Sequence, residues 1–280
     1  MGPPPATDSR IDLHTHSRAS DGEFTASEVA ERAKAAGIGV WALSDHDTVA
    51  GLEEARVAAD RAGIRLVPGI ELSVFLDQKE IHVLGHFIDP THPSVRNFED
   101  FLAARRRERM GQIVVKLAAL GIRVRVEDIE KWSGGKTIGR PHVARALMEV
   151  GAAATVKEAF DRYLGEGKPA YVGRYRLEAD EAVRLLRGAG GTATVAHPGV
   201  SKLERYDLVR LRAAGVEGLE VHHADHVPSQ REKLLRIAEE LSLVPTAGSD
   251  YHGVTISPDR RLGQVTMPAE DLARLEARRP

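Results

Sequence analysis

The sequence contains no cysteine, and this absence excludes several kinds of site. Without thiols the 280-residue chain can form neither a disulfide nor a thiolate zinc site, and it has no cysteine nucleophile. Any metal site must therefore be built from histidine, aspartate and glutamate. The chain has 12 histidines and 41 acidic residues from which to build one.

Long apolar runs and a strong net charge are also missing. No apolar run approaches the ~20 residues of a membrane helix, and the opening MGPPPATDSR has no apolar core of a secretion signal. We therefore expect a cytoplasmic protein without a membrane partner. The formal net charge of -2 provides no broad basic field, so we expect no long tract of nucleic acid to bind.

Common nucleotide-binding and hydrolase motifs are absent as well. The segment SGGKT at 133–137 is similar to a phosphate-binding loop, but that loop requires glycine where this chain has Glu130. We find no G-x-S-x-G nucleophile elbow and no dinucleotide-binding glycine motif after a strand. The chemistry must therefore come from other residues.

What the sequence does contain is an alternation of strand-like and helix-like segments. Apolar runs alternate with runs rich in Ala, Glu and Arg, which predicts repeated βα units and a largely parallel sheet or barrel. The alternation breaks in the middle, so we predict an α/β barrel domain over 1–94 and 171–280 with a helical insertion over 95–170. A helical stretch of the main domain is the alternative interpretation of these residues. The expected strands are 11–16, 39–44, 65–68, 192–196, 218–222 and 243–246, and the expected helices of the barrel are 27–37, 51–63, 179–188, 204–214 and 230–241.

Metal-seeking side chains gather where the predicted strands end. His14 and His16 are two residues apart in a strand, so they share a face with Asp12. Barrel folds assemble their active sites at the C-terminal ends of their strands, where almost all of these residues lie. The candidate ligands are His14, His16, Asp21, His46, Glu71, His82, His197, Asp250 and His252.

Each of these signals alone has an ordinary structural explanation. A single histidine in a strand is more often a hydrogen-bonded core residue, and the DHD segment at 45–47 alone could be a turn or a helix cap. Together they point to metal ions, because burying so many ionisable groups at one barrel mouth costs several kcal/mol unless they are paired, and metal ions supply the missing positive charge. The candidates exceed the four ligands of one structural zinc, so we predict two or three divalent ions.

The mixture of ligand types narrows the choice of ion and of reaction. Imidazole and carboxylate together suit zinc, manganese or iron, whereas the many histidines argue against a pure magnesium or calcium site. Clustered divalent ions activate water and hold the attacking and leaving oxygens of a phosphoryl group. Hydrolysis of phosphate esters is therefore the expected reaction, and amide or amidine hydrolysis is chemically compatible.

The motifs of this chain resemble those of a known family. DLHTHS, SDG, LSDHDT, GIELS, IHVLG, AHPG and GSDYH, in this order and spacing, resemble the PHP (polymerase and histidinol phosphatase) family of metal-dependent phosphoesterases. The similarity is greatest to the branch of nucleoside 3',5'-bisphosphate (pAp) phosphatases, which also remove nucleotides from the 5' end of short RNA. It implies a distorted (β/α)7 barrel with a helical insertion and a trinuclear metal site.

The resemblance also implies a ligand set for each of three ions. Glu71 would bridge two ions, while Asp12 and Asp45 would be catalytic-site residues that orient histidine rings. Asp21 stands where many relatives have histidine, which shifts the preference toward manganese or iron. The implied sets are His14, His16, Glu71 and Asp250 for one ion, Asp21, His46 and His252 for a second, and Glu71, His82 and His197 for a third.

Arginine residues of the insertion are the candidates for binding a substrate phosphate. We favour Arg140 and His142, because they follow a Gly-rich turn at an expected helix start and the family branch has an equivalent pattern. An arginine run inside a long helix is more often a solvated face. The weaker candidates are Arg105, Arg106, Arg107, Arg109, Arg174, His222 and His223.

Functions of two classes remain open at this point. The first is a hydrolase that acts on a small phosphate ester or a short oligonucleotide without an obligate protein partner, with histidinol-phosphate phosphatase as the alternative enzyme. The second is a non-catalytic accessory module stabilised by its metals. The complete ligand set favours the enzyme. The physiological metal, the choice between free nucleotide and RNA end, the general acid and the oligomeric state stay open.

Overall fold

The computed structural model describes residues 10–133 and 138–280. Its chain divides into two compact units, one formed by Met1–Arg96 and Leu177–Pro280 and the other by Asn97–Arg176. The domain limits expected from the sequence, 1–94 with 171–280 and 95–170, stay a prediction. Most of the SGGKT segment, residues 134–137, lies outside the described residues.

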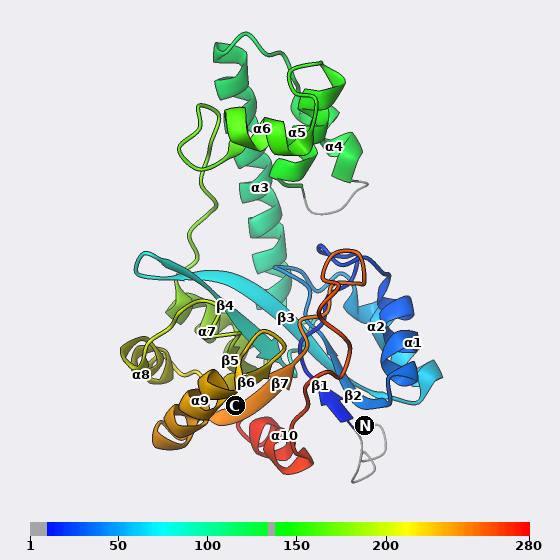
Figure 1. Ribbon diagram of the computed structural model, residues 1–280, viewed down its shortest axis with the longest axis vertical. Coiled ribbons are helices and arrows are strands. Elements are labelled where there is room, and N and C mark those ends of the chain that lie inside the picture. The colour runs from blue at the N-terminus through cyan, green and yellow to red at the C-terminus, as the bar shows by residue number, and fades with distance from the viewer. Residues whose placement is uncertain (1–9, 134–137) are drawn as a thin grey trace. The chain divides into compact units, whose positions relative to one another are not determined.

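A seven-stranded sheet forms the centre of the first unit (Figure 1), with its strands in chain order. Strands β1 to β3 are parallel, β4 runs antiparallel to β3 and β5, and β5 to β7 are parallel again. The strands are β1 (Arg10–Asp12), β2 (Ile38–Leu43), β3 (Arg65–Leu76), β4 (Lys79–His86), β5 (Thr192–Val195), β6 (Gly218–His223) and β7 (Val244–Gly248).

The first and last strands lie close enough to close the sheet almost into a barrel. The amide of Leu13 donates to the carbonyl of Ala247 at 3.0 Å. Farther along, the amide of Asp250 donates to the carbonyl of His14 at 2.8 Å. Thr15 and Tyr251 form a single parallel bridge beyond the strand ends. The predicted α/β barrel is therefore confirmed.

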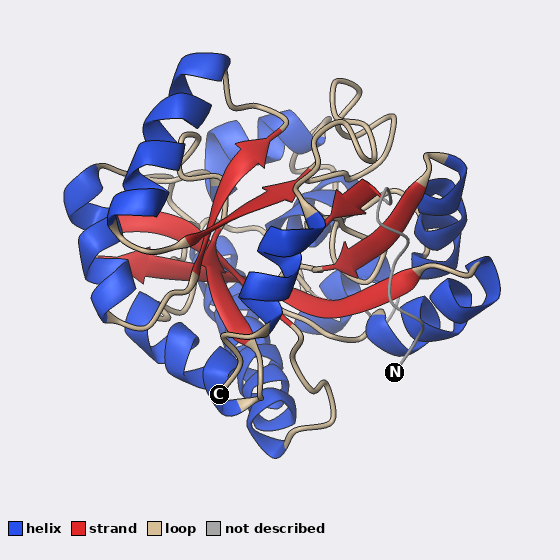
Figure 2. Ribbon diagram, turned by 90° about the horizontal axis from the view of Figure 1, so that it is seen from below, coloured by secondary structure: helices blue, strands red, loops and turns tan. Residues whose placement is uncertain are grey.

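Helices of the first unit surround the strands (Figure 2). Helix α1 begins with a capping box, in which Thr25 Oγ1 accepts from the amide of Glu28 at 3.2 Å and Glu28 accepts from the amide of Thr25 at 2.8 Å. The helices are α1 (Ala26–Ala35), α2 (Leu52–Ala62), α7 (Ala179–Gly188), α8 (Arg205–Ala213), α9 (Pro228–Glu240) and α10 (Ala269–Glu276).

Strand β3 is much longer than the sequence predicted, and it changes partner along its length. Residues Arg65 to Pro68 pair with β2, whereas Gly69 to Leu76 pair with β4. Gly69 permits the crossing, because a Cβ there would lie 3.0 Å from the carbonyl oxygen of Leu43. Glu71 therefore lies inside a long strand, and the expectation that it follows the end of a short one is wrong.

Five helical segments of the second unit form a separate core. They are α3 (Pro93–Ala119), α4 (Val126–Glu130), α5 (Arg140–Glu149), α6 (Val156–Ala159) and the π-helical turn η2 (Phe160–Leu164). The first turn of α3 belongs to the first unit, and the 3-10 turn η1 (Lys131–Ser133) directly follows α4. Met110, Ile113 and Leu147 are fully buried in this core. No helix among the described residues is both long and apolar enough to cross a membrane.

His86 is a fully buried histidine inside the barrel of the first unit. Its Nε2 donates to the carbonyl of Leu13 at 3.0 Å, and its Nδ1 lies 3.3 Å from the hydroxyl of Thr194. Burial disfavours the charged imidazolium and lowers the pKa of His86 to about 4. The ring is therefore neutral when it links β4 to the segment after β1.

This pKa predicts one component of acid sensitivity. Between about pH 4 and the unfolded pKa of ~6.5 the folded chain binds fewer protons than the unfolded chain, so the contribution of His86 to stability is complete above pH 6.5 and is lost toward pH 4. The wild type should lose unfolding free energy when the pH is lowered from 7 to 4. In His86→Gln this loss should be smaller by about 2–3 kcal/mol.

Denaturant unfolding at a series of pH values measures this difference. His92→Gln, at a partly exposed histidine of the same unit, is the control for replacing a histidine with glutamine. Identical pH dependence in His86→Gln and the wild type would contradict the prediction.

Candidate metal centre

The structure gathers the predicted ligands at one end of the barrel. His46, His197 and Asp250 come after the ends of β2, β5 and β7. Strand β4 runs in the opposite direction, so its early residue His82 lies at this same end. We call the following side chains the donor cluster: His14, His16, Asp21, His46, Glu71, His82, His197, Asp250 and His252.

Strand β1 ends at Asp12, four residues earlier than predicted. His14 and His16 therefore lie beyond the strand, in a segment held by backbone hydrogen bonds to residues around Tyr251. Their rings still lie side by side, with centroids 5.1 Å apart. Both side chains are fully buried.

Glu71 occupies the centre of the donor cluster and is fully buried. Its Oε2 lies 3.2 Å from Nε2 of His14 and 3.2 Å from Nε2 of His16. The same oxygen lies 3.1 Å from Nδ1 of His46. One carboxylate oxygen therefore faces three imidazoles from the ends of two strands.

The other oxygen of Glu71 faces a second pair of imidazoles. Oε1 lies 2.8 Å from Nδ1 of His82 and 3.1 Å from Nε2 of His197. Burial by itself would raise the pKa of Glu71, but the surrounding imidazoles, His46 and His14 foremost, hold this pKa well below its usual value. Glu71 is therefore an ionised carboxylate whose two oxygens face opposite sides of the cluster.

The donor atoms fall into compact groups of the size that a metal ion requires. Within each group, one nitrogen or oxygen atom per residue lies within 4.8 Å of all the others. The second group below has the same four members as one ligand set implied by the family resemblance, although their role as ligands stays a prediction. The groups are His16, Asp21, His46 and His252; His14, His16, Glu71 and Asp250; His46, Glu71 and His82; and His14, Glu220 and His223.

Several buried atoms of the cluster make no hydrogen bond, and this observation tests whether metal ions fit. An unpartnered buried donor or acceptor costs about 1–3 kcal/mol. Here the unpartnered atoms are concentrated around one point, and imidazole nitrogens with carboxylate oxygens are the donors that divalent transition metals prefer. The residues present therefore fit divalent cations. The atoms are His14 Nε2, both ring nitrogens of His16, His46 Nδ1, His197 Nδ1 and Glu71 Oε2.

Asp21 lies at the open side of the cluster, with 57 % of its side chain exposed. Its Oδ1 is 3.2 Å from Nε2 of His252, and its Oδ2 is 3.8 Å from Nε2 of His46. The exposed carboxylate next to buried imidazoles marks the side on which the donor cluster meets solvent.

Asp12 and Asp45 contact the backbone around the cluster. Asp12 accepts from the amides of Ser249 and Gly263, each at 2.9 Å. Asp45 accepts from the amide and the hydroxyl of Ser17, each at 2.7 Å. These contacts hold the chain segments that carry the ligands, whereas the predicted orientation of histidine rings by Asp12 and Asp45 stays a prediction.

Sequence reasoning missed Glu220 and Arg260 at this site. Glu220 is fully buried, and its Oε1 lies 2.9 Å from Nδ1 of His14. Arg260 forms an ion pair with Asp250 and another with Asp225 at 2.6 Å. A glutamate within the apolar strand GLEV was a signal that could have been used, whereas nothing in the loop sequence around Arg260 indicates its position.

The two histidines that follow GLEV have different surroundings. His223 is fully buried, and its Nε2 lies 3.4 Å from Oδ2 of Asp250. His222 is half-buried, and burial, followed by the positive charge of Arg231, lowers its pKa. His223 is therefore adjacent to the donor cluster, and His222 faces a different environment.

The candidate phosphate-binding residues belong to the second unit. Arg140 donates to the carbonyl of Leu164 at 3.2 Å, and its guanidinium lies 5.3 Å from the ring centre of Tyr171. His142 Nδ1 accepts from the amide of Gly139 at 2.9 Å and so caps helix α5.

The arginine run of α3 divides into paired residues and one buried residue. Arg105 pairs with Glu108 at 2.7 Å, and Arg107 pairs with Glu130. Arg109 is different, because its Nη2 is buried without a hydrogen-bond partner. Burial, followed by the nearby positive charges of Arg140, Arg174 and Arg106, lowers the pKa of Arg109 to about 10.

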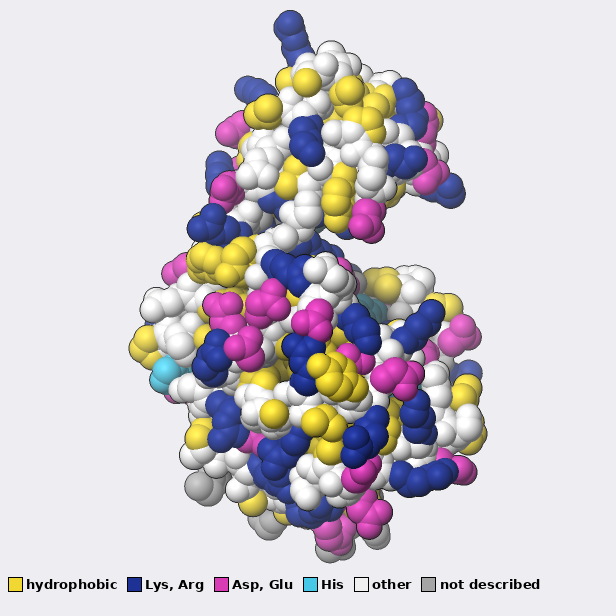
Figure 3. Space-filling model, turned by 90° about the vertical axis from the view of Figure 1, so that its left-hand side faces the viewer, with side chains coloured by type: hydrophobic (Ala, Val, Ile, Leu, Met, Phe, Trp, Pro, Cys, Tyr) yellow, Lys and Arg dark blue, Asp and Glu magenta, His cyan; other side chains and the backbone are white. Residues whose placement is uncertain are grey.

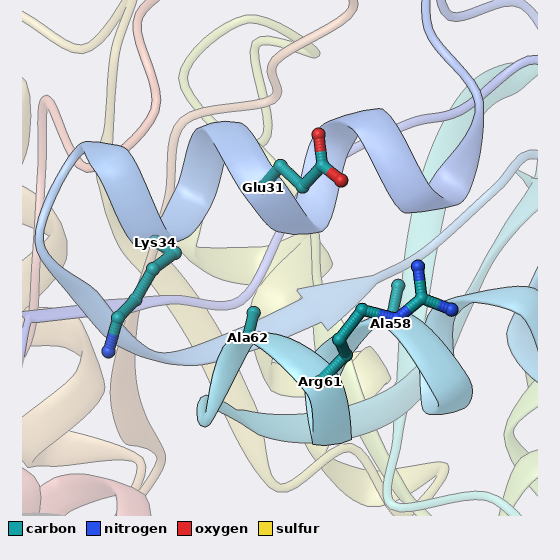
Figure 4. Close-up of a pocket in the computed structure, with 5 residues that line it drawn as sticks. All are labelled: Glu31, Lys34, Ala58, Arg61 and Ala62. Carbon is teal, nitrogen blue, oxygen red and sulfur yellow. The ribbon is translucent and has the colours of Figure 1, made fainter.

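A groove between α1 and α2 lies elsewhere on the first unit (Figure 4). Glu31 and Lys34 of α1 and Arg61 of α2 line it, together with two alanines. Its charges are of both signs and it contains no histidine, so it does not offer the chemistry of the donor cluster.

Comparison with known proteins identifies the family. The PHP domain family matches residues 12–168. A protein named 5'-3' exoribonuclease from Haemophilus influenzae is 37% identical over 247 residues, which cover 87% of this chain and 90% of the relative. The chain belongs to the PHP family. The resemblance that the sequence motifs indicated is therefore confirmed.

Other relatives of this PHP protein agree with that assignment. A protein from Chromobacterium violaceum named 3',5'-nucleoside bisphosphate phosphatase is 38% identical over 247 residues, covering 86% of this chain and 87% of the relative. A crystal structure from Bifidobacterium adolescentis, assigned as a metal-dependent phosphoesterase, superposes with a TM-score of 0.80 at 30% identity, covering 99% of this chain and 98% of that one.

The central position of Glu71 yields a prediction for this PHP protein. Glu71→Ala should reduce the bound metal by at least one ion per chain, because both oxygens of Glu71 face donor groups. Phosphoesterase activity should fall at least about 100-fold. Removal of a residue that only hydrogen-bonds to a metal ligand costs up to about 100-fold, and removal of a ligand itself should cost at least as much.

Elemental analysis of purified protein, combined with activity measurements, checks both effects. Glu53→Ala, at an exposed residue of α2, is the control and should keep its metal and its activity. Unchanged metal stoichiometry in Glu71→Ala would overturn the prediction that Glu71 bridges two ions.

Proposed function

We propose that this chain is a metal-dependent phosphatase of nucleotides that hydrolyses nucleoside 3',5'-bisphosphates such as pAp and also acts on the 5' ends of short RNA. The observation that carries the proposal is the convergence of unpartnered imidazole and carboxylate atoms on Glu71. The names of the relatives from Chromobacterium violaceum and Haemophilus influenzae support these substrate classes.

The donor cluster would hold two or three divalent ions. Glu71 would be shared between them, with Asp250 and His14 on one side and His82 and His197 on the other. Mixed imidazole and carboxylate donors, together with the exposed carboxylate of Asp21, favour manganese, iron or zinc. Divalent ions bound there would lower the pKa of water and neutralise charge on the phosphoryl oxygens.

Side chains around the donor cluster keep the ligands in place. Asp45 accepts from the hydroxyl of Ser20 at 2.6 Å as well as from Ser17, and so fixes the loop that presents Asp21. Arg260 and His223 hold Oδ2 of Asp250. The opposite oxygen, Oδ1, is thereby left facing the imidazoles of the cluster.

Arg140 and His142 are the proposed substrate-binding residues. The cationic surroundings of Arg109 support an anion-binding role for this part of the second unit, since a buried guanidinium beside other arginines favours a phosphate. A bidentate contact with a phosphate would also satisfy a buried Nη2 atom.

The expected partners are small phosphate esters or short oligonucleotides. Basic and acidic side chains are interspersed on the face shown in Figure 3, which fits a small substrate better than a long nucleic acid. The exclusion of long nucleic acid and of an obligate protein partner, and the location in the cytoplasm, stay predictions.

A substrate panel with manganese present tests the proposed function. We expect release of inorganic phosphate from pAp, slower release from a 5'-mononucleotide, and shortening of a 5'-phosphorylated RNA trimer. Turnover of histidinol phosphate in preference to pAp would identify the alternative phosphatase. No turnover of any substrate by protein that contains bound metal would instead support a structural accessory module.

A matched pair of arginine variants tests the substrate-binding residues. Arg140→Ala should raise KM for pAp about 10-fold or more and change kcat less than about 3-fold, because it removes a charged group of the protein that donates hydrogen bonds to the substrate phosphate. Arg105→Ala, where the arginine is exposed and paired with Glu108, should leave both constants unchanged. An unchanged KM in Arg140→Ala would exclude Arg140 from substrate binding.

A further inference from the structure

Glu220 of β6 is a buried carboxylate with a hydrogen-bond donor at each oxygen. Its Oε1 lies 2.9 Å from Nδ1 of His14, and both side chains are almost inaccessible to solvent. Its Oε2 accepts from the backbone amide of His197 at 2.7 Å. One side chain thus joins residues that follow β1 and β5, on opposite sides of β6 in the barrel order.

The contact with Oε1 determines which nitrogen of His14 carries the proton. A carboxylate only accepts hydrogen bonds, so Nδ1 of His14 must be the N–H donor. The lone pair of the neutral ring is then on Nε2, which lies 3.2 Å from Glu71 Oε2 and 3.4 Å from Asp250 Oδ1. This is the nitrogen that is buried without a hydrogen-bond partner.

The contact with Oε2 holds a strained piece of backbone. His197 has a φ of 27°, which is unfavourable for a residue with a side chain. Its amide is fixed by Glu220, and its Nε2 lies 3.1 Å from Oε1 of Glu71. Glu220 therefore anchors a second imidazole of the donor cluster through the main chain.

The neighbouring strand leaves room for this arrangement. Gly248 is the last residue of β7, and a Cβ at this position would overlap Cβ of His14 and Oε1 of Glu220. The absence of a side chain at Gly248 allows the carboxylate and the imidazole to meet.

We propose that Glu220 is a positioning residue for the metal centre, which holds His14 as the Nδ1–H tautomer and anchors the main chain of His197 so that Nε2 of each ring faces Glu71. Metal-binding histidines generally need such a partner for the second ring nitrogen. The inference rests on the proposed metal-dependent function. It assigns a positioning role to a residue outside the nine members of the donor cluster, whose carboxylate also forms a compact group with His14 and His223.

Glutamine at position 220 separates this role from packing. Glu220→Gln has nearly the same volume but presents one acceptor and one donor, whereas both partners are donors. Either the amide of His197 loses its acceptor, or His14 adopts the other tautomer and directs an N–H toward the ions. Both outcomes weaken metal binding without creating a cavity.

Glu217→Gln is the matched control. Glu217 is also buried and lies immediately before β6, three residues from Glu220. Its side chain accepts from the amide of Ala193 at 3.0 Å and pairs with Arg187. It has no part in the donor cluster. A loss of affinity that comes only from removing a buried carboxylate in this region should therefore appear in both variants.

The test measures metal affinity directly on the full chain. Titration calorimetry of the metal-free protein with Zn²⁺ and with Mn²⁺ should show binding that is about 10- to 100-fold weaker in Glu220→Gln than in the wild type. Glu217→Gln should stay within about 2-fold. Wild-type affinity in Glu220→Gln, or an equal loss in both variants, would overturn the positioning role.

Nitrogen NMR of selectively labelled histidines in the Zn²⁺-loaded wild type gives a second readout. His14 should show a proton on Nδ1, and a proton on Nε2 would overturn the proposal even if Glu220→Gln failed to fold. Metal binding without turnover of any phosphate ester would contradict the proposed function but would be consistent with the role of Glu220. A wild-type chain that binds neither ion would overturn both.

Discussion

The attraction between one buried carboxylate and the imidazoles around it organises this site. Glu71 has no access to solvent, so its charge must be balanced by neighbouring groups. Five imidazoles approach its two oxygens within 3.2 Å, and they come from four separate segments of the chain. Metal ions would balance the same charge more fully and would also satisfy the nitrogens that now lack partners. The cluster is therefore built for cations and costs stability without them.

The barrel provides this arrangement through the direction of its strands. Parallel strands place their C-terminal ends together, and the reversed strand β4 contributes its beginning at the same end. Strand β3 is long enough to leave β2 and continue along β4, which carries Glu71 into the centre of the cluster. The crossing depends on Gly69, where a larger residue would approach the carbonyl oxygens of both neighbouring strands. The absence of a side chain at Gly69 thus allows β3 to place the Glu71 carboxylate at the centre of the cluster.

Much of the site could be predicted because its residues lie in short motifs at strand ends. His14 and Asp250 were found in this way, since a histidine or an aspartate after an apolar run is conspicuous. Glu220 was missed because it lies inside the apolar strand and its importance depends on a partner more than 200 positions away, as the separation of 206 residues from His14 shows. Arg260 was missed because a loop has no periodicity from which to infer its direction. The periodicity of the sequence predicts strands and helices, but it does not indicate which side chains far apart in the chain contact one another.

The line along which β1 meets β7 and closes the barrel, here called the seam, has a consequence for folding. Few backbone hydrogen bonds cross it, and one contact across it, from the amide of Ser249 to Asp12, joins residues 237 positions apart. Closing so large a loop is entropically costly and slow compared with pairing successive strands. His16 and Asp250 lie on opposite sides of the seam, so an ion bound by both would link the two ends of the sheet. Bound metal would then stabilise the closed barrel in addition to its part in the reaction.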